Sequence, residues 1–157
     1  MHTLLLRELT AQLMEFPEPN SLMDAWRWLF PSPLRLQRIT LMGDAFLVAD
    51  DDTVFFLDAT RGTLEQIATS PSSLRQLMAE RWFKERYFHA EKVSQLQQLG
   101  KEAAQGECFT YTLPLALGGK DELANLVNTP LSTHFGLLGH LHKKESVEKG
   151  TKLTSVV

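Results

Sequence analysis

Residues 41–67 read LMGDAFLVADDDTVFFLDATRGTLEQI, and the fold class follows from them. Three short runs rich in β-branched and aromatic residues, 46–48, 54–57 and 63–67, are separated by segments 50–52 and 59–62. Aspartate tolerates turn conformations and glycine supplies a positive φ, so both separators are typical of hairpin turns. Together with residues 36–41, the runs predict an antiparallel meander of three or four strands.

Apolar residues at helical spacing lie on both sides of this meander. Leucines between residues 4 and 13 predict a first amphipathic helix that ends before Pro17, and residues 20–30 predict a second, short helix. Ser70-Pro71 pairs a capping hydroxyl group with a proline suited to the first helical position. From there to Leu99 the pattern predicts two helices, with a break between Ala79 and His89.

The C-terminal third predicts one strand and one helix. Residues 108–117 alternate loosely and indicate a strand that Gly118-Gly119 closes. Thr129-Pro130 repeats the cap-and-proline signature and starts a last helix. The expected fold class is α+β: an antiparallel β-meander packed against several helices in a single compact domain.

Length and composition are those of an ordinary globular protein. A chain of 157 residues with 43% hydrophobic residues can form one domain without metal or disulfide support. The one cysteine, Cys108, cannot form an internal disulfide. Neither a signal peptide nor an apolar run of about 20 residues is recognisable, so we expect a cytoplasmic protein without a membrane span.

Charge is distributed unevenly along the chain. Residues 1–67 hold 5 Lys+Arg against 10 Asp+Glu, whereas residues 68–157 hold 11 against 9. A nucleic-acid binder should show a basic stripe, and none is visible in the sequence. The acidic half favours a basic protein surface as partner, with Asp50, Asp51 and Asp52 at its centre and Asp44 and Asp58 as further contributors. A solvated hairpin turn is the alternative for these aspartates.

Other candidate sites have simpler structural explanations. His134, His140 and His142 lack the i, i+4 spacing of a helical zinc pair, so solvent-facing or capping roles are expected. Residues 50–52 lack the glycine and distal glutamate of a calcium loop. Cys108 has no basic neighbour in the sequence and is expected to be a buried, inert thiol. We therefore expect no metal and no cofactor.

No catalytic motif is recognisable either. Gly118-Gly119-Lys120 lacks the first glycine and the following hydroxyl residue of a phosphate-binding loop, and no nucleophile–base pair can be assembled. We therefore expect no enzymatic activity. Aromatic residues at 82, 83, 87 and 88 indicate the apolar side of a helix, and a surplus exposed ring there would anchor a protein interface. Trp82 and Tyr87 are the candidates for that anchor.

Two segments carry a family resemblance. The first is Leu41-Met42-Gly43-Asp44-Ala45-Phe46 followed by Val54-Phe55-Phe56-Leu57-Asp58 and Gly62; the second is Glu107-Cys108-Phe109-Thr110-Tyr111 followed by Pro114-Leu115-Ala116-Leu117-Gly118-Gly119. Their order resembles the C-terminal domain of type VI secretion immunity proteins, a family with a GAD-like N-terminal half that protects bacteria from DNase effectors. The resemblance implies an immunity-type α+β domain at residues 41–143 and a shortened GAD-like helical segment at 1–40. Residues 144–157 are rich in charged, serine and threonine residues without a core pattern, which predicts a flexible tail.

The same resemblance implies a function and a partner. It implies a protein that binds and neutralises a secreted antibacterial toxin, most specifically a type VI nuclease effector, with no catalytic residues of its own. The acidic residues named above would then face the basic cleft of the nuclease. Two alternatives remain open: a small-ligand or nucleotide sensor that uses the turn at Gly118-Gly119, and an adaptor subunit of a secretion assembly.

Overall fold

The computed structural model describes the backbone of residues 4–13 and 18–156, and the side chains of these residues as far as residue 149. A central antiparallel sheet has the strand order β1-β2-β3-β4, and a separate antiparallel pair is formed by β5 and β6. The strands are β1 (Leu34–Ile39), β2 (Ala45–Ala49), β3 (Val54–Asp58), β4 (Thr63–Ala68), β5 (Glu107–Tyr111) and β6 (Leu126–Pro130). The predicted α+β class is confirmed, and the predicted meander of three or four strands has four.

Helical segments precede and follow the sheet in the chain. They are η1 (Leu6–Leu9), η2 (Pro19–Leu29), α1 (Pro71–Met78), α2 (Arg81–Phe88), α3 (Ala90–Gln98), η3 (Leu115–Leu117), η4 (Leu123–Asn125) and α4 (Leu131–Val156). The Ser70 hydroxyl accepts a hydrogen bond from the N–H of Ser73, as its capping position predicts. In the described part of the chain, no helix combines the length and apolarity that crossing a bilayer requires.

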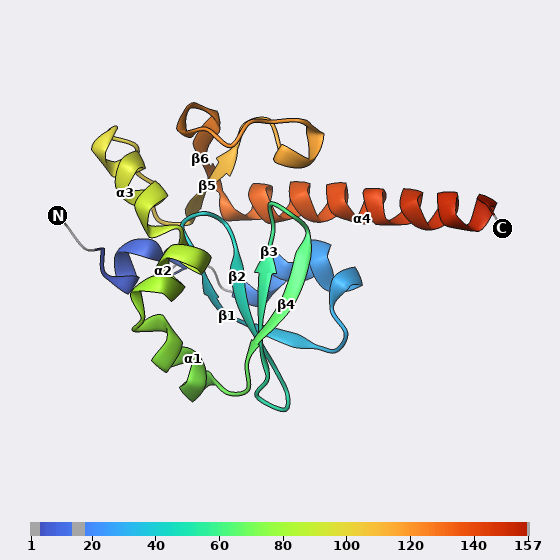
Figure 1. The fold of residues 1–157 in the computed structure, drawn as a ribbon, viewed down its shortest axis with the longest axis horizontal. Coiled ribbons are helices and arrows are strands. Elements are labelled where there is room, and N and C mark those ends of the chain that lie inside the picture. The colour runs from blue at the N-terminus through green and yellow to red at the C-terminus, as the bar shows by residue number, and fades with distance from the viewer. Residues whose placement is uncertain (1–3, 14–17, 157) are drawn as a thin grey trace.

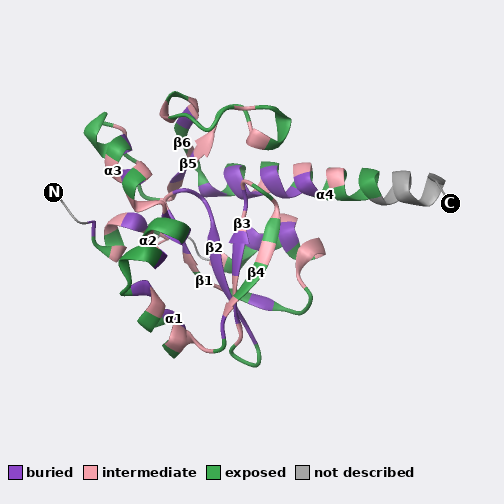
Figure 2. Ribbon diagram, viewed as in Figure 1, coloured by how far each residue is buried: buried purple, intermediate pink, exposed green. Residues whose placement is uncertain are grey.

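Both faces of the central sheet are covered, and this explains why β2 is buried throughout (Figures 1 and 2). Successive side chains of a strand point to opposite faces. Phe46 and Val48 join the core beside α1, α2 and α3, where the ring of Phe46 lies 5.2 Å from that of Phe88. Leu47 and its neighbours on the other face join the core of η2 and α4, around Trp26 and Phe135.

The two predicted hairpin turns are confirmed, and each contains a residue with a positive φ. Asp52 has φ 72° in the turn between β2 and β3, and Gly62 has φ 73° in the turn between β3 and β4. Strand β3 lies between the two turns and runs the length of the sheet, so the turns lie at opposite ends of the sheet (Figure 1).

The N-terminal leucines form a helix only over η1, so the prediction of a helix from residue 4 to residue 13 is wrong in extent, and residues 14–17 lie outside the described part. The N–H of Ala11 donates to the carbonyl oxygen of Ile39, and the N–H of Leu41 donates to that of Leu9. Pairing with the sheet edge therefore replaces helical hydrogen bonds, as tertiary context often overrides local preference.

Three further differences concern the second half of the chain. Residues 71–98 form three helices instead of two, because His89 adopts a left-handed conformation with φ 52° and adds a second break. Strand β6 was not predicted. The last helix continues to Val156, so the backbone expected to be a loose tail is helical.

Candidate partner-binding surface

The five aspartates expected at a partner surface are divided between the two ends of the central sheet. Asp50, Asp51 and Asp52 are exposed in the turn between β2 and β3. Asp44 precedes β2 and Asp58 ends β3 at the other end, where both line one small cavity. The structure thus brings Asp44 and Asp58 together and separates them from the acidic turn, the name used below for residues 50–52.

The acidic turn has a defined shape. The N–H of Asp52 and the carbonyl oxygen of Thr53 both bond to the backbone of Ala49, at 2.9 Å each. Hydrogen bonds from Thr53, including the one from its N–H to Asp51 Oδ1 at 3.1 Å, hold the pKa of Asp51 below its ordinary value. No ion pair involves these three carboxylates among the described side chains. The turn therefore presents fixed, uncompensated negative charge to solvent.

Asp44 is a buried structural carboxyl group. It is 3% exposed, and its Oδ1 accepts a hydrogen bond from the N–H of Ala59 at 3.0 Å. Burial raises the pKa of Asp44 well above its ordinary value, and the negative charge of Asp58 raises it further. Asp44 thereby connects the turn before β2 to the turn after β3, and its carboxyl group is not on the surface.

The two aromatic candidates on α2 have different environments. Trp82 is 55% exposed, and its ring packs edge-on against Phe83 with 5.7 Å between centroids. Tyr87 is buried in the core, and its hydroxyl group donates to Glu65 Oε1 at 3.0 Å. Of the two, Trp82 alone offers most of its ring to a partner.

The loop between β5 and β6, residues 112–125, is held rigidly at its base by Asn125. The Asn125 side chain accepts from the N–H of Leu113 at 3.0 Å and donates to the carbonyl oxygens of Leu113 and Lys120. Its backbone carbonyl accepts from the N–H of Thr112 at 2.7 Å. From outside the loop, the Lys101 amine donates to the carbonyl oxygens of Leu123 and Leu126. These hydrogen bonds tie the two ends of the loop together and connect it to the segment that follows α3.

Gly118 and Gly119 allow this loop to close. Gly118 has φ 94°, and a Cβ atom added to Gly119 would lie 1.9 Å from the carbonyl oxygen of Leu113. The apolar residues of the loop gain little burial from the closure, since Leu113 is 49% and Leu117 is 56% exposed. The loop thus leaves Leu113 and Leu117 about half exposed on a hydrogen-bonded backbone.

A polar cluster lies below the loop. The Tyr111 hydroxyl group donates to Asp121 Oδ1 at 2.5 Å, and the Lys92 amine donates to the same oxygen at 2.9 Å. These hydrogen bonds, that from Lys92 first, hold the pKa of Asp121 below its ordinary value. The cluster ties α3 to the loop and borders the cavity of about 40 Å³ that Asp44 and Asp58 also line.

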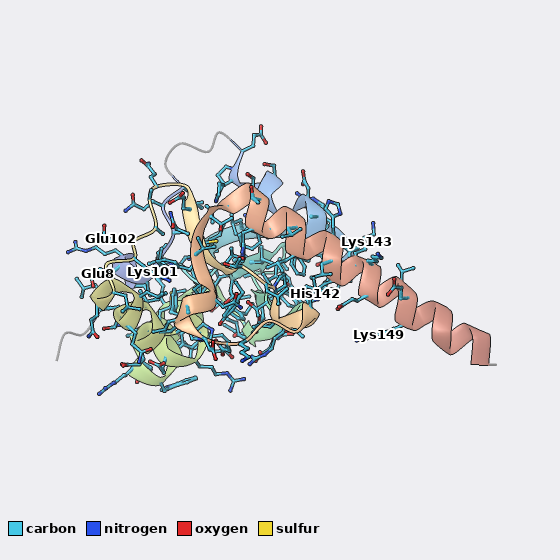
Figure 3. All side chains as sticks on the ribbon, turned by 90° about the horizontal axis from the view of Figure 1, so that it is seen from above. Glu8, Lys101, Glu102, His142, Lys143 and Lys149 are labelled. Carbon is cyan, nitrogen blue, oxygen red and sulfur yellow. The ribbon has the colours of Figure 1, made fainter. Side chains whose placement is uncertain are left out.

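An open groove of about 520 Å³ lies between the loop, the β3–β4 turn and α4. Leu115 and Ala116 line it from the loop, and Glu145, Glu148 and Lys149 line it from α4. It shares Thr60, Arg61 and Leu115 with the small cavity, so the two hollows are adjacent. Figure 3 shows the stretch of α4 that carries His142 and Lys149 running past the end of the sheet.

Two of the three histidines of α4 are buried, so of the two roles expected, solvent-facing or capping, the solvent-facing one is wrong for these two. His134 bonds through Nε2 to the carbonyl oxygen of Gly43 at 2.7 Å and through Nδ1 to the Thr110 hydroxyl group at 2.9 Å. His142 bonds through Nε2 to the carbonyl oxygen of Thr60 at 3.2 Å. The two rings thus join α4 to the turns at one end of the sheet, while His140 is exposed.

Cys108 is buried in β5, as predicted, and burial raises the pKa of its thiol far above the ordinary value. Within residues 4–13 and 18–149, no group of three or more His, Cys, Asp or Glu side chains is arranged to hold a metal ion.

Residues 69–142 match the family described as T6SS immunity protein Tdi1, C-terminal. The match covers slightly less than half of the chain and supports the resemblance to type VI secretion immunity proteins. Type VI secretion immunity proteins bind a cognate effector and are not catalytic, which supports the expectation that the chain is not an enzyme. The matched residues include the second of the two motifs, at 107–119, and the whole loop 112–125.

The fold has a counterpart of known structure. The protein is similar to the one described as "Crystal structure of Atu4351 from Agrobacterium tumefaciens", with a TM-score of 0.55 and 12% sequence identity. The similarity covers 79% of this chain and 64% of that chain, so this chain spans about two thirds of that protein's length. At this identity the likeness concerns the fold alone. A comparison with curated proteins gave no match.

Sequence reasoning did not identify the loop as a surface feature. Its signal was present: five residues, Leu113 to Leu117, are all apolar and lie between a strand and two glycines. Such a run in a turn region can be either core or an exposed contact. The exposure of Leu113 and Leu117 depends on the Asn125 hydrogen bonds, which pair residues 12 positions apart.

Proposed function

We propose that this chain protects the cytoplasm of its bacterium by binding a cognate type VI effector that degrades DNA. The family match supports immunity and an effector as partner. The observation that favours a nuclease is the acidic turn, three exposed aspartates whose carboxylates have no ion-pair partner among the described side chains. A nuclease needs a basic cleft to hold phosphates, so its surface complements such a turn.

We assign to Asp50, Asp51 and Asp52 the electrostatic steering of the effector toward this protein. Charged groups around an interface mainly raise the association rate and set specificity, and they do so without deep burial. Trp82 is a second candidate contact, since large exposed rings are frequent anchors at interfaces. Asp44 and Tyr87 support the surface from within through their bonds to Ala59 and Glu65.

The experiment is a titration of the purified protein into a DNA-cleavage assay of the effector encoded by the neighbouring gene. We expect cleavage to fall linearly and to cease near one equivalent. An effector that binds the protein tightly but cleaves no DNA would overturn the nuclease assignment and leave immunity intact. An effector that continues to cleave DNA in the presence of excess protein would overturn both.

A further inference from the structure

The rigid loop 112–125 exposes leucines that the fold leaves uncovered. Removing a leucine side chain from water is favourable, and Leu113 and Leu117 obtain only part of this stabilisation within the chain. A mobile loop would lose entropy when a partner ordered it. Asn125 and Lys101 already fix this loop, so a partner that covers it would meet a preorganised surface.

The hollows beside the loop carry an excess of carboxyl groups. Asp44, Asp58, Asp121, Glu145 and Glu148 line the small cavity and the open groove. The cations that line them are Arg61, Lys92 and Lys149. Arg61 and Lys92 are already engaged, with Asp58 at 3.5 Å and Asp121 at 2.9 Å. Asp44 is buried, and its raised pKa disfavours its charge, so it adds nothing to the surface. In the open groove Glu145, which lies 3.6 Å from His142, and Glu148 exceed the remaining cation, Lys149, by one charge. This local excess of one carboxylate is complementary to a lysine or an arginine of a partner.

We propose that the loop 112–125 and the adjoining groove form the anchoring face for the effector, which offers an apolar depression for Leu113 and Leu117 beside a lysine or arginine that enters the groove. This inference rests on the proposed function and adds to it the surface and the chemistry of the partner. The carboxylates of the groove favour a protein over a lipid surface as partner, because an anionic membrane would repel them.

The anchoring face and the acidic turn then have separate roles. Buried apolar anchors determine how long a complex persists, whereas peripheral charges determine how fast it forms. The loop lies within the segment that matches the immunity family, whereas the acidic turn precedes that segment and Glu145 and Glu148 of the groove follow it.

The test uses the variant Leu113→Ser/Leu117→Ser in the full-length protein. The matched control is Leu99→Ser/Leu137→Ser, which changes two leucines that are 61% and 60% exposed outside the loop. Thermal unfolding verifies that both variants fold, and surface plasmon resonance measures affinity for an inactive form of the effector. We expect the loop variant to bind at least about 30-fold more weakly through faster dissociation, and the control to bind within about threefold of the unaltered protein.

Each outcome has a distinct meaning. A loop variant that binds as tightly as the unaltered protein would overturn the anchoring face while leaving immunity in place. An unaltered protein that does not bind the effector would overturn the proposed function and this inference with it. Co-sedimentation with vesicles of phosphatidylcholine and phosphatidylglycerol that depends on Leu113 and Leu117 would replace the effector by a membrane as the occupant of this face.

Discussion

Nε2 of His134 donates a hydrogen bond to the carbonyl oxygen of Gly43 at 2.7 Å, and the imidazole ring occupies the space that a Cβ atom at residue 43 would need. A carbonyl oxygen can only accept, so Nε2 carries the proton, and Nδ1 accepts from the Thr110 hydroxyl group. One neutral imidazole thus joins α4, the turn before β2 and strand β5.

Gly43→Ala tests this contact. The new Cβ atom would lie 2.1 Å from Nε2 of His134, and the backbone has φ 81°, so we expect a loss of about 3 kcal/mol in the free energy of unfolding. Gly100→Ala is the matched control, because Gly100 has φ 76° but nothing within 4 Å, and about 1 kcal/mol is expected from backbone strain alone. Equal losses in urea denaturation would show that the ring contact contributes nothing.

Acid should weaken the fold through the same histidine. Burial lowers the pKa of His134 to about 4, so between pH 6.5 and 4 the unfolded chain binds a proton that the native chain does not. Stability from this group is complete above pH 6.5 and declines as the pH falls, by about 2 kcal/mol at pH 5. Asp44 acts in the opposite direction, because its raised pKa favours the native chain as the pH falls.

The variant His134→Gln separates the effect of His134 on the pH dependence of stability from that of Asp44. Glutamine can still donate to Gly43 but does not titrate, so the stability difference between the unaltered protein and the variant should shrink by about 2 kcal/mol from pH 7.5 to pH 5. Urea denaturation at both pH values measures it. A difference that stays constant with pH would mean that His134 is not protonated preferentially in the unfolded chain.

Much of the fold could be predicted from local patterns. Strands β2, β3 and β4 were identified because aspartate and glycine turns separate short β-rich runs, and the start of α1 was identified from Ser70-Pro71. The N-terminal helix was overestimated because the spacing of its leucines is helical, whereas the hydrogen bonds of Ala11 and Leu41 lie between segments distant in sequence. Strand β6 was missed because Thr129-Pro130, at its end, equally signals a helix start.

The candidate surface was predicted only in part. The exposure of the acidic turn follows from its turn chemistry, but the burial of Asp44 does not, because it depends on Ala59 from another turn. Likewise, the burial of His134 and His142 depends on Gly43 and Gly62, each of which leaves room for a ring. Long-range fits of this kind have no signal within a single segment of sequence.

Neutralising the acidic turn should slow complex formation. For Asp50→Asn/Asp51→Asn/Asp52→Asn we expect association about tenfold slower at low ionic strength, with a weaker dependence on salt and little change in dissociation. The control, Glu80→Gln/Glu91→Gln/Glu102→Gln, removes the same charge from exposed positions elsewhere. Stopped-flow association at several salt concentrations distinguishes them, and equal rates for the two variants would remove the turn from the interface.

Removing the Asn125 side chain should loosen the loop 112–125 while the core stays folded. Asn125→Ala removes the side-chain bonds to Leu113 and Lys120, so we expect faster hydrogen exchange in residues 112–125 and a local loss of about 1–2 kcal/mol. Asn128→Ala is the control, because the Asn128 side chain bonds to Glu107 Oε1 outside the loop. Unchanged exchange in Asn125→Ala would contradict the role of this side chain as the clamp of the loop.

The most direct test of the account is survival of bacterial cells that express the effector from the neighbouring gene, with and without this protein. We predict that the effector alone kills and fragments chromosomal DNA, and that co-expression of this protein restores growth and yields a complex that can be isolated from the cells. Killing that continues when the protein is present and folded would contradict the assignment of immunity.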